Sequence, residues 1–145
     1  MAGHILNEKL ESLRRCVARI EEKRAPSVEA LLFDADRQDI LAINITRAVQ
    51  ICVDMAAHVV ACNDEPAPAT MGEAFDGLHH LGIIDAASCS TLKAAVGFRN
   101  VAVHSYQAID WEIVHAIAWH RLEEFRAFAI AIRNYLESAR DFDER

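Results

Sequence analysis

Three side chains with complementary chemistry stand close together in the chain: Arg99, His104 and Tyr106. An imidazole titrates near neutral pH and can transfer a proton. A guanidinium can hold a phosphate through two parallel hydrogen bonds and can stabilise negative charge as it grows in a transition state. Arg99 and His104 are therefore candidate catalytic residues for metal-independent RNA cleavage, and Asn100 is a candidate donor of a further hydrogen bond.

The spacing of the pair restricts how it can act. Five residues of α-helix turn through about 500°, so Arg99 and His104 would point about 140° apart on one straight helix. Either the helix ends between them, or the site draws on two chains related by a twofold axis. The structural alternative is that Arg99 pairs with a carboxylate, His104 sits at a helix end and Tyr106 belongs to the core.

A second polar feature lies on the helix expected over about 37–62. Four polar residues separated by three, four and four positions fall within an arc of about 80° on one helix face: Arg47, Gln50, Asp54 and His58. One interpretation is a solvated face, which every surface helix has. The other is a polar wall facing the Arg99–His104 site, in which Asp54 would orient Arg99 or a histidine by a hydrogen bond.

The elements that must position these residues are all helical. Apolar residues repeat every three or four positions in four segments, which predicts four main helices. The first spans about 4–24, and the second runs from the N-cap Asp36 to Cys62. The third begins after the N-cap Asp85, and the last begins after the N-cap Asp110 and runs without interruption to about Leu136. A short turn is expected over 27–33, and a short helix between the capping box of Thr70 and Glu73 and the stop at Gly82. The tail 141–145 is expected to fray. These elements predict an all-α bundle of four main helices plus one or two short helices.

Composition and charge narrow the function classes. With 145 residues, 52% of them hydrophobic, the chain can form one domain with a sizeable core. The net charge of −7 predicts a local basic pocket rather than a broad basic face for any RNA substrate. No apolar run approaches a membrane span, and no secretion signal is evident, so a soluble cytoplasmic protein is expected. Neither a cofactor nor a metal site is predicted, and the cysteines are expected to be free thiols, mostly buried: Cys16, Cys52, Cys62 and Cys89.

The pattern Arg-x4-His-x-Tyr that Arg99, His104 and Tyr106 form resembles the signature of HEPN-domain ribonuclease toxins of the HepT-like branch. The resemblance covers almost the whole chain. The pair Asp54 and His58 on the long second helix also looks like that family, as do the sequence Gly97-Phe98-Arg99-Asn100 and the final helix that begins after Asp110. It implies a HEPN-type bundle in a single domain spanning residues 1–145.

The resemblance also implies a function. The chain would be an endoribonuclease toxin of a type II or VII toxin–antitoxin pair, a homodimer that leaves 2′,3′-cyclic phosphate and 5′-hydroxyl ends. Its partner would be a nucleotidyltransferase-fold antitoxin that adds AMP to Tyr106. Arg99 and His104 would be catalytic, with four supporting residues: Asn100, Asp54, His58 and Arg47. The alternative, which the acidic charge favours, is a non-catalytic helical HEPN module that binds nucleotide or a nucleotidyltransferase partner.

Overall fold

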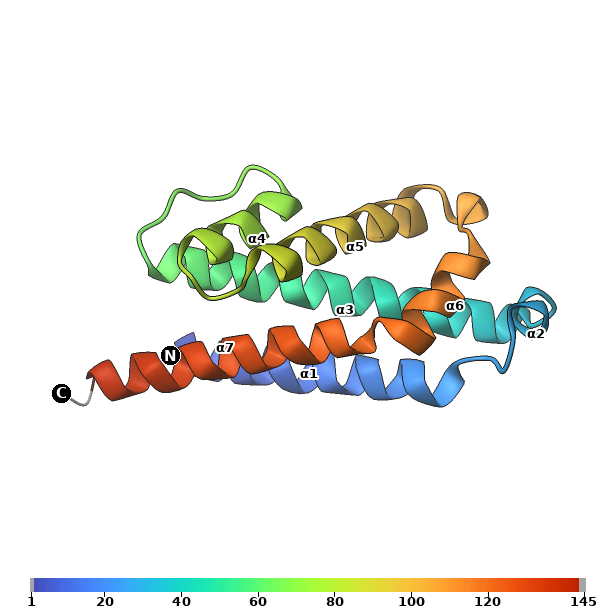
Figure 1. Cartoon of the computed structure of the whole chain (residues 1–145), viewed down its shortest axis with the longest axis horizontal. Coiled ribbons are helices and arrows are strands. Elements are labelled where there is room, and N and C mark those ends of the chain that lie inside the picture. The colour runs from blue at the N-terminus through green and yellow to red at the C-terminus, as the bar shows by residue number, and fades with distance from the viewer. Residues whose placement is uncertain (1, 144–145) are drawn as a thin grey trace.

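The computed structural model describes the backbone of residues 2–143 and the side chains of residues 3–139. Within this range the chain forms seven α-helices and one 3-10 helix, so the all-α prediction is confirmed. The four longest helices form the bundle, in which α3 lies between α5 on one side and α1 on the other (Figure 1). These are α1 (Ala2–Lys23), α3 (Ala35–Cys62), α5 (Ala86–His104) and α7 (Leu122–Asp143).

The shorter helices join the long ones. A single helical turn, α2 (Val28–Leu32), connects α1 to α3, and α4 (Met71–His80) packs against both α3 and α5. The 3-10 helix η1 (Tyr106–Ala108) and α6 (Trp111–His120) connect α5 to α7. The tail is helical as far as Asp143, beyond the point where fraying is expected, and residues 144–145 lie outside the described residues.

Local side-chain caps explain where several helices begin. Thr70 accepts a hydrogen bond from the backbone N–H of Glu73 at 3.2 Å, and Asp85 accepts one from Ser88 at 2.7 Å, as their sequence patterns predict. Asp110 likewise caps α6. The prediction of Asp36 as a cap is wrong, because Asp34 accepts from the backbone N–H of Arg37 at 3.0 Å and α3 therefore begins at Ala35.

The final helix is the main difference from the sequence prediction. The expected single helix after Asp110 is divided at Arg121 into α6 and α7. The indole N–H of Trp119 donates to the carbonyl of Ala25 at 2.8 Å, and the Arg24 guanidinium lies 3.9 Å from the centre of the Trp119 ring. These contacts anchor α6 to the segment after α1, and the turn at Arg121 then lets α7 run alongside α1 (Figure 1).

The core is centred on α3, which packs against each of the other bundle helices. Phe75 of α4 and Phe128 of α7 pack edge to face at 5.9 Å, which ties the short helix to the bundle. A Cβ atom at Gly77 would lie 2.6 Å from Cγ2 of Val60, so the close contact of α4 with α3 requires glycine there. Gly82 has a φ of 77° just after α4, as expected for the residue that ends it.

Two expectations about hydrophobic residues have different outcomes. Cys16, Cys52 and Cys89 are buried free thiols, whereas Cys62 is exposed. The expectation that no apolar run approaches a membrane span fails for α3, whose most apolar 18-residue window has a mean hydropathy of 1.5 and is long enough to cross a bilayer. However, 56% of that window is buried inside the bundle. The core helix of a soluble protein passes the same test of length and composition, so the test is weak evidence for a span.

Candidate functional site

The structure decides one of the two alternatives that the Arg99–His104 spacing leaves open. Helix α5 continues unbroken through both residues and ends after His104, where the backbone N–H of Ser105 donates to the carbonyl of Val101 at 2.8 Å. The two side chains therefore leave one helix about 140° apart. The alternative in which the helix ends between them is therefore excluded.

Arg99 lies partly buried at the end of the apolar seam that Leu92 and Val96 form along α5. Its Nη1 donates to Oδ1 of the adjacent Asn100 at 3.1 Å, and its Nε is buried without a hydrogen-bond partner in the described part of the chain. No carboxylate among residues 3–139 forms an ion pair with it. The guanidinium therefore keeps an uncompensated charge and free donors, which are properties suited to holding an anion.

Tyr106 is exposed and therefore does not belong to the core, whereas His104 is the exposed last residue of α5, at the helix end that the structural alternative expects. The Tyr106 hydroxyl donates to Oδ1 of Asp39 on α3, and its ring packs edge to face against Trp111 at 5.9 Å. Partial burial of the phenol, followed by the hydrogen bond to the Asp39 carboxylate and its negative charge, raises the pKa of Tyr106 to about 12. Tyr106 therefore presents a neutral hydroxyl whose proton already faces an acceptor.

The polar stripe of α3 lies next to α1. Asp54 accepts hydrogen bonds from Gln50 at 2.9 Å and from Lys9 of α1 at 3.4 Å. Within one chain Asp54 is therefore held by these two residues rather than by Arg99 or a histidine. His58 is half-buried, and its Nε2 has no hydrogen-bond partner among the described residues.

Arg47, the first residue of the stripe, is exposed beside α1, where it lines a groove together with Gln50. Asn100 is exposed next to Arg99 and, as the acceptor of its hydrogen bond, fixes the direction of the guanidinium. The structure thus brings Asn100 to Arg99 and leaves the other supporting candidates on the outer face of α3.

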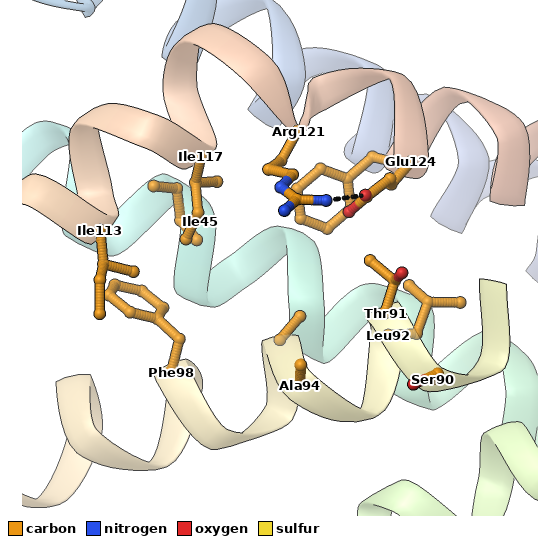
Figure 2. A pocket seen from close by; sticks show the side chains of 12 residues that line it. Ile45, Ser90, Thr91, Leu92, Ala94, Phe98, Ile113, Ile117, Arg121 and Glu124 are labelled. Carbon is orange, nitrogen blue, oxygen red and sulfur yellow. Dashed lines mark hydrogen bonds and ion pairs between the residues drawn. The ribbon is translucent and has the colours of Figure 1, made fainter. Parts of the chain in front are cut away.

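A pocket of about 350 Å³ is lined by residues of α3, α5, α6 and α7. Figure 2 shows Phe98 pointing toward Ile113 of α6, while Arg121 and Glu124 form an ion pair at 2.9 Å above the cavity. The lining is mostly apolar and includes none of the residues of the Arg99–His104 motif.

Sequence reasoning missed Asp39, the partner of Tyr106. Its position carries a usable signal, because Asp39, Ile43, Arg47, Gln50 and Asp54 are separated by four, four, three and four residues. These spacings place all five residues on one face of α3. Asp39 therefore belongs to the same stripe and could have been found by extending it toward the N-terminus.

Comparisons with known proteins identify the family of the chain. The family model described as Ribonuclease HepT-like matches residues 9–132 of the chain. The chain belongs to the HepT-like family. It is similar to the mRNA nuclease HepT of Shewanella oneidensis, with 30% identity over 129 residues that cover 89% of this chain and 96% of that protein.

Solved structures place this HepT-like chain among toxins crystallised with their antitoxins. One is a toxin–antitoxin structure with AMP-PNP, at a TM-score of 0.85 and 28% identity, which covers 90% of this chain and 98% of the other. Another is the tri-AMPylated HEPN toxin of Shewanella oneidensis in complex with an MNT antitoxin, at a TM-score of 0.84 and 29% identity, covering 90% of this chain and 97% of the other. The cytosolic protein YutE of Bacillus subtilis, of unknown function, shares the fold at a TM-score of 0.82 but only 14% identity.

Proposed function

We propose that this HepT-like chain is a metal-independent endoribonuclease toxin that acts as a homodimer. The observation that carries the proposal is the guanidinium of Arg99, which is partly buried, has no carboxylate partner among the described residues and is directed by Asn100. An ionised group kept without a counterion inside a protein surface is costly unless a ligand supplies the opposite charge. A phosphodiester of RNA is such a ligand, and nuclease activity is the named function of a relative that is 30% identical.

The proposed reaction is attack of the ribose 2′-hydroxyl on the adjacent phosphorus. His104 assists the proton transfer, the bond to the 5′-oxygen breaks, and the products are a 2′,3′-cyclic phosphate and a 5′-hydroxyl. Arg99 holds the phosphate and stabilises the charge that develops on its oxygens. The Asn100 amide accepts from Arg99 through its oxygen, which leaves its nitrogen free to donate to the substrate.

The dimer is proposed because one helix directs Arg99 and His104 to different sides, whereas a second copy related by a twofold axis can bring His104 of one chain to Arg99 of the other. Exposed apolar residues near the motif support contact between copies. Val101 and Val103 of α5 are 39% and 48% exposed, Tyr106 is 41% exposed, and Ile43, one turn from Asp39 on α3, is 48% exposed. Apolar side chains gathered around a functional motif are typical of an interaction surface.

The proposed partner is a nucleotidyltransferase-fold antitoxin that transfers AMP to Tyr106. The tyrosine is exposed, follows His104 by two residues, and directs its hydroxyl proton to the Asp39 carboxylate, which can accept it as the phenol oxygen attacks the α-phosphorus of ATP and pyrophosphate leaves. An AMP group at this position adds negative charge where the RNA phosphate binds, so it would block the substrate. A cytoplasmic location belongs to the same proposal, because the RNA substrate and the antitoxin meet there.

The test of the proposed function is cleavage of a labelled RNA by purified variants. Arg99→Ala and His104→Ala should each lower the cleavage rate by about 100-fold or more, the usual contribution of a positioned acid, base or anion-binding group. The matched control is His120→Ala, because His120 is also an exposed histidine in the last position of a helix, α6, and should retain cleavage. Full activity of His104→Ala would refute the mechanism. A wild-type chain that accepts AMP but cleaves no RNA would favour the non-catalytic module.

A further inference from the structure

A second feature of the surface is a groove between α1 and α3 with a volume of about 590 Å³. Its lining contains no acidic residue, although the chain as a whole carries a net charge of −7. Three arginines and three neutral polar side chains line it: Arg15, Arg19, Arg47, Ser12, Asn44 and Gln50. Such a local basic groove on an acidic protein needs an explanation of its own.

The charges in this groove are largely uncompensated. Arg15 and Arg47 are exposed and form no ion pair or hydrogen bond within residues 3–139, and Arg19 pairs only with the exposed Glu22 at 3.1 Å. Both Arg15 and Arg47 act on the thiol of Cys16 in the groove: burial raises the pKa of that thiol, and the two guanidinium groups oppose the increase. The guanidinium groups of two helices therefore converge on one place.

The groove also lies along the polar stripe of α3, which Asp39 extends toward Tyr106. Asp39, which accepts the hydrogen bond from Tyr106, lies on the same face of α3 as Arg47 and Gln50. Eight residues separate Asp39 from Arg47, and this distance corresponds to about 12 Å along the helix axis. Asp54, four residues beyond Gln50 in the stripe, is paired with Lys9. A strand that leaves the Arg99–His104 motif past Tyr106 would thus meet cations after about two helical turns.

We propose that this groove binds the phosphate backbone of single-stranded RNA on one side of the bond that is cleaved. The inference rests on the proposed ribonuclease function. Guanidinium groups bind phosphates through paired hydrogen bonds, and side-chain amides and hydroxyls such as those of Asn44, Gln50 and Ser12 can bond to phosphate and ribose oxygens. No aromatic side chain lines the groove, so it offers no platform for base stacking. The groove therefore contacts the backbone and adds affinity with little sequence preference.

The experiment measures binding of a fluorescent 12-nucleotide oligouridylate to the His104→Ala protein, which is not expected to cleave it. Arg15→Gln and Arg47→Gln are combined in this background, and the dissociation constant is measured over a series of salt concentrations. Loss of two phosphate contacts should reduce the slope of log affinity against log salt by about 1.4, since a single-stranded phosphate contributes about 0.7. Affinity at low salt should fall by about tenfold or more.

The matched control combines Arg14→Gln and Arg133→Gln in the same background. These two exposed arginines line a different groove, between α1 and α7, and their loss changes the net charge by the same amount. The control should keep the salt slope of the parent protein. A pair of variants with equal slopes would overturn the inference, because the effect would then be one of total charge.

Two further measurements separate this inference from the proposed function. If the wild-type chain cleaves RNA and the Arg15/Arg47 double variant keeps the parent slope, the groove inference fails and the nuclease proposal stands. If the wild-type chain cleaves no RNA and the His104→Ala protein binds none, the nuclease proposal fails and the groove inference fails with it. Sedimentation of the double variant completes the test, because loss of the dimer would identify the groove as a contact between chains and would overturn the inference.

Discussion

Mixed dimers test whether the catalytic pair comes from two chains. One chain carries Arg99→Ala and keeps His104, and the other carries His104→Ala and keeps Arg99. Helix α5 runs unbroken through both positions and directs their side chains about 140° apart, and the proposed site therefore pairs Arg99 of one copy with His104 of the other. In a mixed dimer one of the two possible pairs is then intact, and the other lacks both groups.

The expected activity follows from this arrangement. Random exchange of subunits in an equimolar mixture gives about half mixed dimers, each with one of two pairs intact, so the mixture should recover about one quarter of the wild-type rate. Each variant alone should stay about 100-fold or more below wild type. If Arg99 and His104 of the same chain formed the site, every chain in the mixture would lack one group and no activity would return.

The assay uses two affinity tags and co-expression, so that mixed dimers are isolated by sequential purification and their composition is checked by native mass spectrometry. The readout is initial-rate cleavage of a labelled RNA. The control pairs the Arg99→Ala chain with a chain that carries both substitutions, because this dimer has the same tags but no intact pair. Verified mixed dimers that are inactive would refute the two-chain site, and so would full activity of a sedimentation-defined monomer.

Four further predictions concern chemistry and packing. EDTA should leave RNA cleavage unchanged within about twofold, because the proposed reaction uses only side chains, and loss of cleavage that a divalent ion restores would contradict it. Co-expression with the nucleotidyltransferase partner should add AMP to Tyr106 and inhibit RNA cleavage, whereas Tyr106→Phe should keep most of the cleavage activity and escape this inhibition. Peptide mass spectra that show an unmodified Tyr106 in an inhibited sample would exclude inhibition by AMP transfer to this residue. Burial of the phenol, followed by its hydrogen bond to Asp39, raises the pKa of Tyr106 to about 12. The stabilisation linked to the neutral phenol is therefore complete below the ordinary phenol pKa of about 10 and is lost as the pH rises toward 12. Asp39→Asn should lower the pKa of Tyr106 in a UV titration with Tyr106→Phe as the reference, and an unchanged pKa would assign the whole shift to burial. Gly77→Ala should destabilise the fold by about 1–3 kcal/mol in urea unfolding, because its Cβ would lie 2.6 Å from Val60, and a cost that Val60→Ala does not partly relieve would contradict this cause.

The helices could be predicted from the sequence because their signals are local. The caps at Thr70, Asp85 and Asp110 are each satisfied by a backbone N–H two or three residues further along, so neighbouring residues suffice to identify them. The break at Arg121 has no such signal, since neither glycine nor proline lies near it. Just before the break, Trp119 bonds to Ala25, and these two residues are far apart in the sequence.

The same distinction applies to the candidate site. The divergence of Arg99 and His104 follows from helix geometry alone, and the continuous α5 agrees with it. The hydrogen bonds of Asp54 to Lys9 and of Tyr106 to Asp39 depend on which helices pack side by side, so no pattern within α3 could assign them. Periodicity places Arg47, Gln50, Asp54 and His58 on one face of α3, and tertiary packing decides that α1 flanks that face.

The acidic charge of the chain is compatible with an RNA substrate once the pairing of each arginine is considered. Arg14, Arg121 and Arg126 form ion pairs with nearby glutamates, so these cations contribute little net attraction at their surface. Arg15 and Arg47 flank the outer face of α3 without a carboxylate partner in the described chain, as does Arg99 on α5. A phosphate binds to unpaired cations at short range, whereas salt screens the more distant acidic residues. The positions of these arginines therefore determine RNA binding more than the net charge of −7 does. The negative net charge would instead slow the long-range approach of RNA. Cleavage at low substrate concentration should therefore be faster at moderate than at very low ionic strength. At higher ionic strength the rate should fall again, because salt then screens the short-range contacts as well.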